Sequence, residues 1–413
     1  PSVSWGQPTD DIFEGSHAFV LGKTSDVPGI QVLDRYTIRF RLTQPVAVFP
    51  YILAESFNMV VPKAAIMKEP PGYFDSHPIG TGPFMFQSWD KSTNRIIVVR
   101  NPHYFHTGKP YIDKIIADFN MPKNLIALKI EKGDLTGAGT NGSVDPADLD
   151  QARHDPTFVH YLVDAPPVDV FWLELNVHAA PLDKLAIRQA IAMAINRAHL
   201  VQLMGGHALP STQMYIPLDP QHDPTLDQHP VYAYAPQKAA ALVKASGYTG
   251  QPITLLYGSP GGPVEGYILG VQQDLRQIGL NVTLRGVTGG TFFATVKSLS
   301  GHQLSINDWS IDFPDAYDIY SGVLSCAANA DGASAGAHYC NPAADNLVNH
   351  AEALPLGPDR NALMRQAQIL NLQSASRVAL IVDKATEMVS PKVAGFYYVP
   401  TFGWQYENYW LKP

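Results

Sequence analysis

The sequence predicts an α/β fold with more than one domain, and three features carry that prediction. Amphipathic helices alternate with short apolar strands in the second half of the chain, which is typical of an α/β lobe. The 413 residues exceed the ~100–200 residues of a typical domain. With 46% hydrophobic and 16% charged residues, the composition is that of a globular protein, so general disorder is excluded.

The first half of the chain is expected to contain mainly strands. Residues 36–42 alternate apolar and polar side chains, which predicts a half-buried strand. A polar turn at 90–94 separates two apolar runs, as in a hairpin. The expected elements are strands at 36–42, 84–89, 95–99 and 112–119, followed by a short helix at 124–132.

Helices and strands alternate after residue 182. The apolar spacing predicts one long helix over 182–204, with Gly205 and Gly206 as its stop. Glycines also close the two helices that follow, and each of these helices leads into a strand. The expected helices are 236–246, 266–278 and 358–374, and the expected strands are 253–257, 281–285, 379–382 and 393–399.

Charge and hydropathy exclude two classes of protein. The net charge is −8 and no dense Lys/Arg cluster is present, so nucleic-acid binding is not expected. No apolar run approaches the roughly 18 residues of a membrane span. The sequence begins at Pro1 without a signal peptide, which we interpret as a processing boundary; it does not assign a compartment.

The two cysteines, Cys326 and Cys340, are separated by thirteen residues rich in small side chains. A disulfide across a loop of ~15 residues stabilises a fold by up to about 3 kcal/mol, and it indicates an oxidising compartment. Two free thiols and a metal site are the alternatives. His338 is the only nearby imidazole, so a metal would lack a fourth ligand. No cofactor and no metal site are predicted.

Two glycine motifs match nucleotide-binding patterns without the context that those patterns need. Gly137–Gly142 reads GxGxxG, but no apolar strand precedes it and a proline follows, so a loop is expected. Gly22-Lys23-Thr24 resembles the end of a P-loop, but position 17, where the first glycine belongs, is His17.

A third motif, GxSxG around Ser334, matches the nucleophile elbow of hydrolases. It lies between the two cysteines and follows no buried strand, which the elbow requires. Asp345 and His350 lie downstream in the order used by an esterase. A secreted serine hydrolase that uses Ser334 is therefore the alternative from another class of protein.

The segment Asp308–Asp315 is the strongest candidate site. It follows an expected strand end and combines Trp309, Phe313 and three carboxylates within eight residues. Aromatic walls and a carboxylate that orients a cation are common in small-molecule pockets. A surface turn with solvated acids and a core tryptophan is the alternative interpretation.

A series of motifs spans nearly the whole chain. The more specific ones are Pro78–Phe84 (PIGTGPF) and Arg100–Tyr104 (RNPHY), with a strand pair between them. Further segments are Leu33–Pro45, Leu173–Asn176, Ile187–Ile195, Gly206–Pro210, Ala239–Tyr248, Asp274–Leu280, Asp308–Asp315 and Val393–Phe396. In this order they resemble family 5 of the extracellular solute-binding proteins, the peptide/nickel-binding class that serves ABC importers.

This resemblance implies a two-lobed, periplasmic-binding-protein-like fold of type II with an extra subdomain. Lobe I is expected to comprise residues 1–170 and 384–413, and lobe II residues 171–383. Residues 13–42 resemble a segment that usually lies ~100 residues in from the mature N-terminus, so lobe I is expected to be incomplete. An unpaired sheet edge or an exposed apolar face is expected around Pro78–Phe84.

The resemblance also implies a function. We expect an extracytoplasmic protein, not an enzyme, that captures a peptide or similar polar solute by hinge closure and delivers it to a membrane ABC permease. It would act as a monomer without a cofactor, either in the periplasm or as a lipoprotein at the outer face of the cytoplasmic membrane. A nickel-chelate or oligosaccharide carrier is the alternative within the family.

The ligand-binding residues that follow from the segment and the resemblance are Asp312, Trp309, Phe313, Ser310, Trp172 and Asn176. In peptide-binding members a carboxylate like that of Asp312 pairs with the ligand α-amine, a bond worth roughly 1.5–3 kcal/mol. Pro263–Tyr267 lacks the arginine that holds the ligand carboxylate in some dipeptide-binding relatives, which leaves a longer peptide or a cationic or sugar-like solute open. Core packing is the alternative for Trp172.

The resemblance also bears on the two cysteines. Asn341-Pro342 after Cys340 resembles some dipeptide-binding relatives and supports the disulfide.

Overall fold

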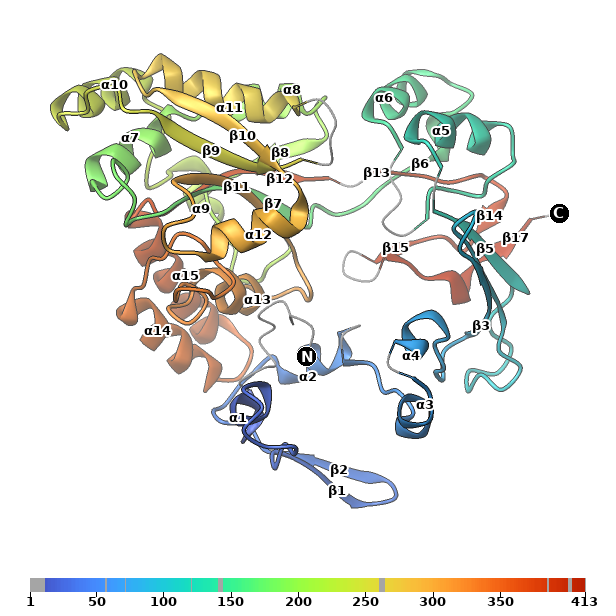
Figure 1. Cartoon of the computed structure of the whole chain (residues 1–413). Coiled ribbons are helices and arrows are strands. Elements are labelled where there is room, and N and C mark those ends of the chain that lie inside the picture. The colour runs from blue at the N-terminus through green and yellow to red at the C-terminus, as the bar shows by residue number, and fades with distance from the viewer. Residues whose placement is uncertain are drawn as a thin grey trace. The chain divides into compact units, whose positions relative to one another are not determined.

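A six-stranded mixed sheet is the centre of the larger of two structural units (Figure 1). Unit 1 comprises the chain up to Leu53 together with Pro167–Asp383, and unit 2 comprises Ala54–Pro166 with Lys384–Pro413. The computed structural model describes residues 12–55, 58–70, 72–119, 121–139, 144–259, 264–384, 386–399 and 403–412.

The sheet of unit 1 has the strand order β10-β9-β11-β7-β12-β8. The strands are β7 Asp169–Leu175, β8 Ala208–Pro210, β9 Ile253–Gly258, β10 Val282–Val287, β11 Leu304–Ser310 and β12 Arg377–Asp383. β9 runs parallel to β10 and β11, whereas β7 is antiparallel to both of its neighbours, β11 and β12. β7 is buried on both faces, which explains its nearly continuous apolar sequence.

Helices cover both faces of this sheet, as Figure 1 shows. On one face, α7 Leu185–Ala194, α8 Arg197–Leu203, α10 Pro236–Ala245 and α11 Gly266–Gln277 enclose a core that includes Leu173 and Leu175 of β7. On the other face, α13 Tyr317–Ile319, α14 Pro342–Glu352 and α15 Pro358–Gln373 enclose a second core with Val170 and Trp172. In the part of unit 1 that the structure describes, the other strands form the hairpin of β1 Ile30–Asp34 with β2 Thr37–Phe40. The other helices there are α1 Ser16–Val20, α2 Phe49–Ala54, α9 Pro224–Gln228, α12 Gly289–Lys297 and a π-helical turn Tyr320–Leu324.

The long helix predicted over 182–204 is wrong as a single element. α7 ends at Ala194, the backbone of Ile195 is extended, and α8 begins after Asn196. The Asn196 side chain accepts a hydrogen bond from the backbone N–H of His199 at 3.1 Å, which is the geometry of an N-cap. The helices predicted near α10, α11 and α15 are confirmed, whereas α12 and α14 were not predicted.

Unit 2 consists of small sheets and short helices. Its three-stranded antiparallel sheet contains β3 Phe84–Asp90, β4 Arg95–Arg100 and β5 Lys114–Asp118. Its two-stranded pairs are β6 Leu162–Asp164 with β13 Thr386–Met388, β14 Val393–Ala394 with β17 Trp410–Leu411, and β15 Tyr398–Val399 with β16 Gly403–Trp404. Its helices are α3 Lys63–Lys68, α4 Tyr73–Ser76, α5 Lys123–Glu131 and α6 Pro146–His154, with short 3-10 turns at Val159–Tyr161 and Tyr406–Asn408.

The N-terminal part of the expected lobe I belongs to unit 1. Val46, Val48 and Ile52 are buried in the core that also holds Phe313. The backbone N–H of Ala47 donates to the carboxylate of Glu352 at 3.0 Å. These contacts attach the chain before Leu53 to α14 and to the loop after β11, and this stretch therefore belongs to unit 1. The lobe boundaries expected from the sequence stay a prediction.

The segment around Pro78–Phe84 exposes apolar side chains, as the sequence predicted. Within the described residues β3 pairs only with β4, so it is an edge strand. Ile79 is 56% exposed and Met85 is 41% exposed. Ile79 also borders a cavity of about 400 Å³, together with Tyr73 and His77, whose rings stack at 4.1 Å.

No helix in the described part of the chain has the length and hydropathy needed to cross a bilayer.

Candidate functional site

The candidate segment Asp308–Asp315 starts in β11 and continues into the loop before α13. β11 pairs with β7 in a register that places Asp308 opposite Phe171 and Ser310 opposite Asp169. Since side chains alternate along a strand, Asp308 and Ser310 lie on the α11 face and Trp309 lies on the opposite face. The strand pairing ends at Ser310, and Ile311 and Phe313 of the following loop lie in the core that also holds Trp172.

Trp309 and the backbone of Asp312 are held by one buried carboxyl group, that of Asp318. The indole Nε1–H of Trp309 donates to Asp318 Oδ2 at 3.0 Å, and the Asp312 N–H donates to the same oxygen at 2.8 Å. The indole ring also packs on Gly322, where an added Cβ would lie 2.7 Å from the ring. The loop conformation therefore depends on Asp318 and on the small size of residue 322.

The side chain of Asp312 is half-buried and available to a ligand. Its carboxylate accepts no hydrogen bond from any residue that the structure describes, whereas its neighbour Asp318 is fully buried. Burial raises the pKa of Asp312 to about 6. Burial and the charge of Asp312 raise the pKa of Asp318 well above its ordinary value, so Asp312 is the member of the pair that ionises at neutral pH. A single carboxylate is thus presented where an ammonium group could bind.

Ser310 and Phe313 flank Asp312 in different environments. The Ser310 hydroxyl is exposed and donates a hydrogen bond to the Asp169 carboxylate. Phe313 is buried, and its ring lies 6.2 Å from that of Tyr51. Phe313 therefore anchors the loop in the core and does not supply an exposed aromatic wall.

Two of the six predicted ligand contacts, Trp172 and Asn176, lie in the interior of unit 1. Trp172 is 3% exposed and belongs to the core beneath α14 and α15. Asn176 is fully buried, and its amide donates to the carbonyl groups of Leu299 at 2.7 Å and His302 at 3.1 Å. Trp172 is covered because helices pack on both faces of β7, and Asn176 just after β7 is held by its hydrogen bonds, so unit 1 offers neither side chain to a ligand.

The third carboxylate of the segment, Asp315, is structural. It accepts two hydrogen bonds from the Arg360 guanidinium, both at 2.8 Å, and one from Gln221 at 2.8 Å. Arg360 is fully buried and also pairs with Glu352. This network ties the loop after β11 to α14 and α15, and no local pattern in the sequence could have indicated it.

Sequence reasoning missed two carboxylates beside the segment, Asp318 and Asp169. Asp318 lies three residues beyond the segment and has no local signature. Asp169 interrupts an apolar run at 168–173, and such an interruption at a strand end was a usable signal.

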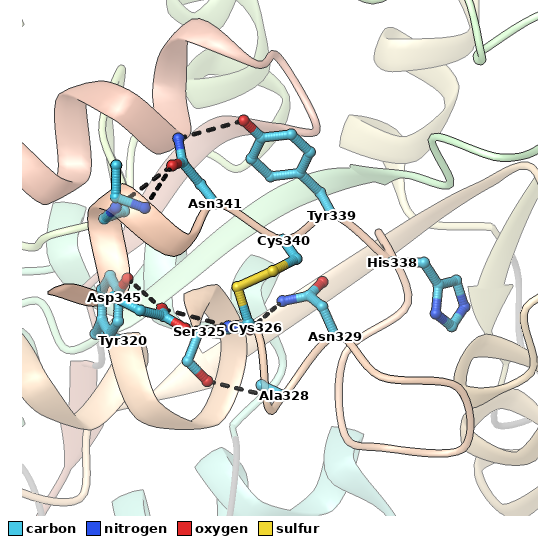
Figure 2. The surroundings of a disulfide bond; sticks show 12 residues. Tyr320, Ser325, Cys326, Ala328, Asn329, His338, Tyr339, Cys340, Asn341 and Asp345 are labelled. Carbon is cyan, nitrogen blue, oxygen red and sulfur yellow. Dashed lines mark hydrogen bonds between the residues drawn. A yellow bond between two sulfur atoms is a disulfide. The ribbon is translucent and has the colours of Figure 1, made fainter.

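Cys326 and Cys340 form a disulfide, which confirms the first of the three interpretations (Figure 2). The Asp345 carboxylate accepts a hydrogen bond from the Cys326 N–H at 3.2 Å, and Asn341 caps α14 through the N–H groups of Ala343 and Ala344. The described residues contain no group of three or more His, Cys, Asp or Glu that could hold a metal ion.

The residues of the hydrolase alternative do not assemble into a triad. Ser334 Oγ donates to the Gly322 carbonyl at 2.7 Å, and Asp345 accepts from the Tyr320 hydroxyl at 2.7 Å. His350 is exposed on α14 and forms no hydrogen bond with either residue in the described ranges.

Two other sequence features fall partly outside the described residues. Gly142 of the GxGxxG match lies outside them, and Gly137 forms an isolated bridge with Val389 in unit 2. Pro263 of the segment that lacks arginine also lies outside them, whereas Glu265 and Tyr267 are described.

Comparison with known proteins places the chain among solute-binding proteins. Residues 5–331 match the family described as "Bacterial extracellular solute-binding proteins, family 5 Middle". The chain is 26% identical over 414 residues to the dipeptide-binding protein of Escherichia coli (strain K12), an alignment that covers 96% of this chain and 73% of that protein. It is 26% identical over 387 residues to the glutathione-binding protein GsiB of Pectobacterium atrosepticum, with 92% and 73% covered.

Solved structures share the fold. The periplasmic binding protein DppA from Helicobacter pylori, in complex with the peptide STSA, matches with a TM-score of 0.80 at 24% identity, over 95% of this chain and 76% of that one. A dipeptide binding protein from Pseudoalteromonas sp. SM9913 matches with a TM-score of 0.77 at 20% identity, over 96% and 78%. The predicted α/β fold class and the predicted family are thereby confirmed, and the chain belongs to family 5 of the bacterial extracellular solute-binding proteins.

Proposed function

We propose that the protein captures peptides by their free α-amino group and that Asp312 is the residue that binds this amine. The observation that carries the proposal is the Asp312 carboxylate, which is half-buried, fixed through its backbone N–H and free of hydrogen bonds from the described residues. A charge-assisted hydrogen bond in such a setting contributes roughly 1.5–3 kcal/mol to binding.

The environment of Asp312 supports an amine in preference to an anion. The charged group shown beside it is Asp318, which is also acidic. The Asp312 carboxylate repels an anionic group and attracts an ammonium group. The names of the relatives, which include a dipeptide-binding and a glutathione-binding protein, agree with a ligand of this class.

Delivery to a membrane ABC permease completes the proposed role, as the family resemblance implies. We place the protein outside the cytoplasm, as a monomer that is either free or lipid-anchored, and that binds no nucleic acid. The disulfide supports an oxidising compartment.

The first test is peptide binding measured by isothermal titration calorimetry. We expect Ala-Ala-Ala to bind the wild-type protein and N-acetyl-Ala-Ala-Ala to bind about tenfold or more weakly, because acetylation removes the ammonium charge. Asp312→Asn should weaken binding of the free-amine peptide by a similar factor and leave the acetylated peptide unaffected.

Asp359→Asn is the matched control for this experiment. Asp359 is an exposed carboxylate in the first turn of α15, so the substitution makes the same change in net charge within unit 1. Equal binding of the two peptides by the wild-type protein would disprove the role of the amine. A wild-type protein that binds no member of a free peptide library would disprove peptide capture itself.

A further inference from the structure

Two buried histidines, His302 and His338, lie close together in unit 1, and we name them the histidine pair. His302 is 8% exposed and His338 is 6% exposed, and their ring centroids are 6.5 Å apart. His302 lies two residues before β11, and His338 lies two residues before Cys340, in the loop that the disulfide closes. The His338 ring points away from the disulfide (Figure 2). The pair is therefore distinct from the segment that carries Asp312.

All four ring nitrogens of the histidine pair are buried, and none has a hydrogen-bond partner among the described residues. A neutral imidazole has one N–H donor and one nitrogen lone pair. Burial of such groups without partners costs free energy, so most buried polar groups in proteins are paired. Four unpaired nitrogens in one place indicate that a bound species completes the site.

The chain just after β7 holds the backbone of both histidines. The Asn176 amide donates to the His302 carbonyl at 3.1 Å, and His178 Nε2 donates to the His338 carbonyl at 3.2 Å. His338 has a φ of 52°, a left-handed backbone conformation that residues other than glycine and asparagine seldom adopt. The two rings are thus carried by backbone whose position is fixed by hydrogen bonds.

Gly336 lets the disulfide-closed loop approach His302. A Cβ added at residue 336 would lie 2.8 Å from His302 Cε1 and 2.7 Å from the carbonyl oxygen of Val296 in α12, which is too close for real atoms. The histidine pair therefore depends on a close backbone approach that any side chain at residue 336 would prevent.

The spacing of the two rings fits one metal ion between them. A direct N–H···N hydrogen bond would hold the ring centroids roughly 5 Å apart, so a separation of 6.5 Å leaves room for one further atom. Two metal–nitrogen bonds of ~2 Å each give a centroid separation of about 6–6.5 Å when one nitrogen of each ring faces the ion. Nowhere in the described ranges do three or more His, Cys, Asp or Glu residues gather as a metal site, so the ion must be satisfied by two ligands.

Copper(I) is the ion that suits two buried imidazoles. Imidazole is a good ligand for copper, and copper(I), a d10 ion, is stable with two nitrogen ligands in line. Zinc, nickel and copper(II) take four or more ligands, which a buried pair does not supply. The ligating imidazole must be neutral, and burial lowers the pKa of His302 to about 4, so its ring is unprotonated at neutral pH.

We propose that His302 and His338 form a copper(I) site, in which one ring nitrogen of each side chain binds the ion. The site goes beyond the proposed capture of peptides and does not depend on it. A bound ion would connect the start of β11 to the loop that the disulfide closes.

Competition for copper(I) with the chromogenic chelator ferrozine tests the site. We would add the protein to the copper(I)–ferrozine complex without oxygen, with ascorbate as reductant because a thiol would attack the disulfide. The absorbance of the complex falls as the protein removes copper, and the wild type should remove about one equivalent. His302→Gln and His338→Asn should each remove less than about a tenth of that amount, because one imidazole alone binds the ion weakly.

The variants are chosen to preserve the fold. Asparagine tolerates the left-handed backbone of residue 338, and circular dichroism would verify the structure of each variant. His350→Asn is the matched control, because it removes an exposed imidazole on α14, and it should retain the full equivalent. Binding of Ala-Ala-Ala should be the same in His338→Asn and in the wild type, which separates this site from the role of Asp312.

X-ray absorption at the copper edge examines the wild-type protein and depends on no variant. We expect two nitrogen neighbours at about 2 Å and no sulfur neighbour. Sulfur neighbours would assign the copper to methionine side chains and overturn the proposal. A wild type that removes no copper(I) from ferrozine would also overturn it, as would undiminished removal by a folded His302→Gln variant.

Discussion

Asp312 and Asp318 illustrate how two identical side chains six residues apart acquire different roles. Asp318 is fully buried and accepts hydrogen bonds from Trp309 and from the backbone of Asp312, so it shapes the loop. Asp312 remains partly accessible and has the lower pKa of the two. The Asp318 carboxyl group thus holds the loop, and the Asp312 carboxylate is the one that can contact a ligand.

Peptide affinity should depend on pH through Asp312. Its pKa in the free protein is raised to about 6, and only the ionised form pairs with an ammonium group. Affinity for Ala-Ala-Ala should therefore be constant near pH 7 and fall by up to about tenfold per unit of pH well below 6. Calorimetry between pH 5 and 7.5 tests this with Ala-Ala-Ala, whose side chains do not titrate. Asp312→Asn should give a flat profile, and a flat wild-type profile would contradict the role of Asp312.

At this scale the sequence allowed Asp312, Trp309 and Ser310 to be located near one another, because they are consecutive or nearly so. Their individual environments were not predictable. Whether Trp172 faces a ligand or the core depends on α14 and α15, which lie some 170 residues or more away in the chain. Tyr267 and Phe171 were likewise unconnected in the sequence, because only the packing of α11 on the sheet brings their rings together.

At the scale of secondary structure, elements with local signals were predictable and the others were not. α10 and α15 both have a proline in the first turn. α10 also has an amphipathic face and a glycine two residues after its end. These features act within a few residues, so the sequence alone suffices. The break between α7 and α8 was missed because the apolar spacing continues across it, and Asn196 shows its capping role only in three dimensions.

The loop closed by Cys326 and Cys340 should contribute strongly to stability. Its cysteines are 14 positions apart, and closing a loop of ~15 residues stabilises a fold by about 3 kcal/mol. Within it, Asn329 accepts a hydrogen bond from Arg377 of β12 at 2.7 Å and donates to the Val323 carbonyl at 2.9 Å. The loop is therefore connected to the central sheet as well as to its own ends.

Replacement of both cysteines by serine should lower the free energy of unfolding by about 3 kcal/mol in urea titrations. Reductant should have the same effect on the wild type and no effect on the Cys326→Ser/Cys340→Ser variant, which controls for unspecific action of the reductant. Equal stability of variant and wild type would show that loop closure is not a source of stability here.

For the whole molecule, buried acids should set the pH dependence of stability. Burial raises the pKa of Asp219 to about 8 and that of Glu387 to about 7. Such groups bind more protons in the folded than in the unfolded state, so the stability they contribute at low pH is lost as pH rises through these values. His302 acts in the opposite direction, because burial lowers its pKa to about 4 and stability is lost as pH falls from about 6.5 towards that value.

We therefore expect the melting temperature of the ligand-free protein to fall between pH 6 and pH 8.5. Asp219→Asn keeps the shape of the side chain and removes its ionisation, so it should raise Tm by roughly 5 °C at pH 8 and by less at pH 5. Differential scanning fluorimetry over this range provides the measurement, with Asp359→Asn as the exposed control. A Tm that rises steadily with pH, or an equal gain from Asp219→Asn at both pH values, would refute the account.

The division into units was only partly accessible from the sequence. The family resemblance predicts a discontinuous lobe I over residues 1–170 and 384–413, and this stays a prediction. The structure shows two units, of which unit 2 consists of Ala54–Pro166 and Lys384–Pro413. That the first 53 residues belong to unit 1 could not be predicted from the sequence. Val48 and Ile52 pack in a core with residues of α14 and α15, about 300 residues later in the chain.

The disulfide has a practical consequence for spectroscopy. The chain contains two cysteines and both are oxidised, so the folded protein offers no thiol to a maleimide dye. A cysteine introduced at an exposed position, such as Asp359 in unit 1 or Lys114 in unit 2, would be the single reactive site under non-reducing conditions. With a cysteine at each of these positions, a donor and an acceptor dye would measure the distance between the two labels with and without solute, one molecule at a time.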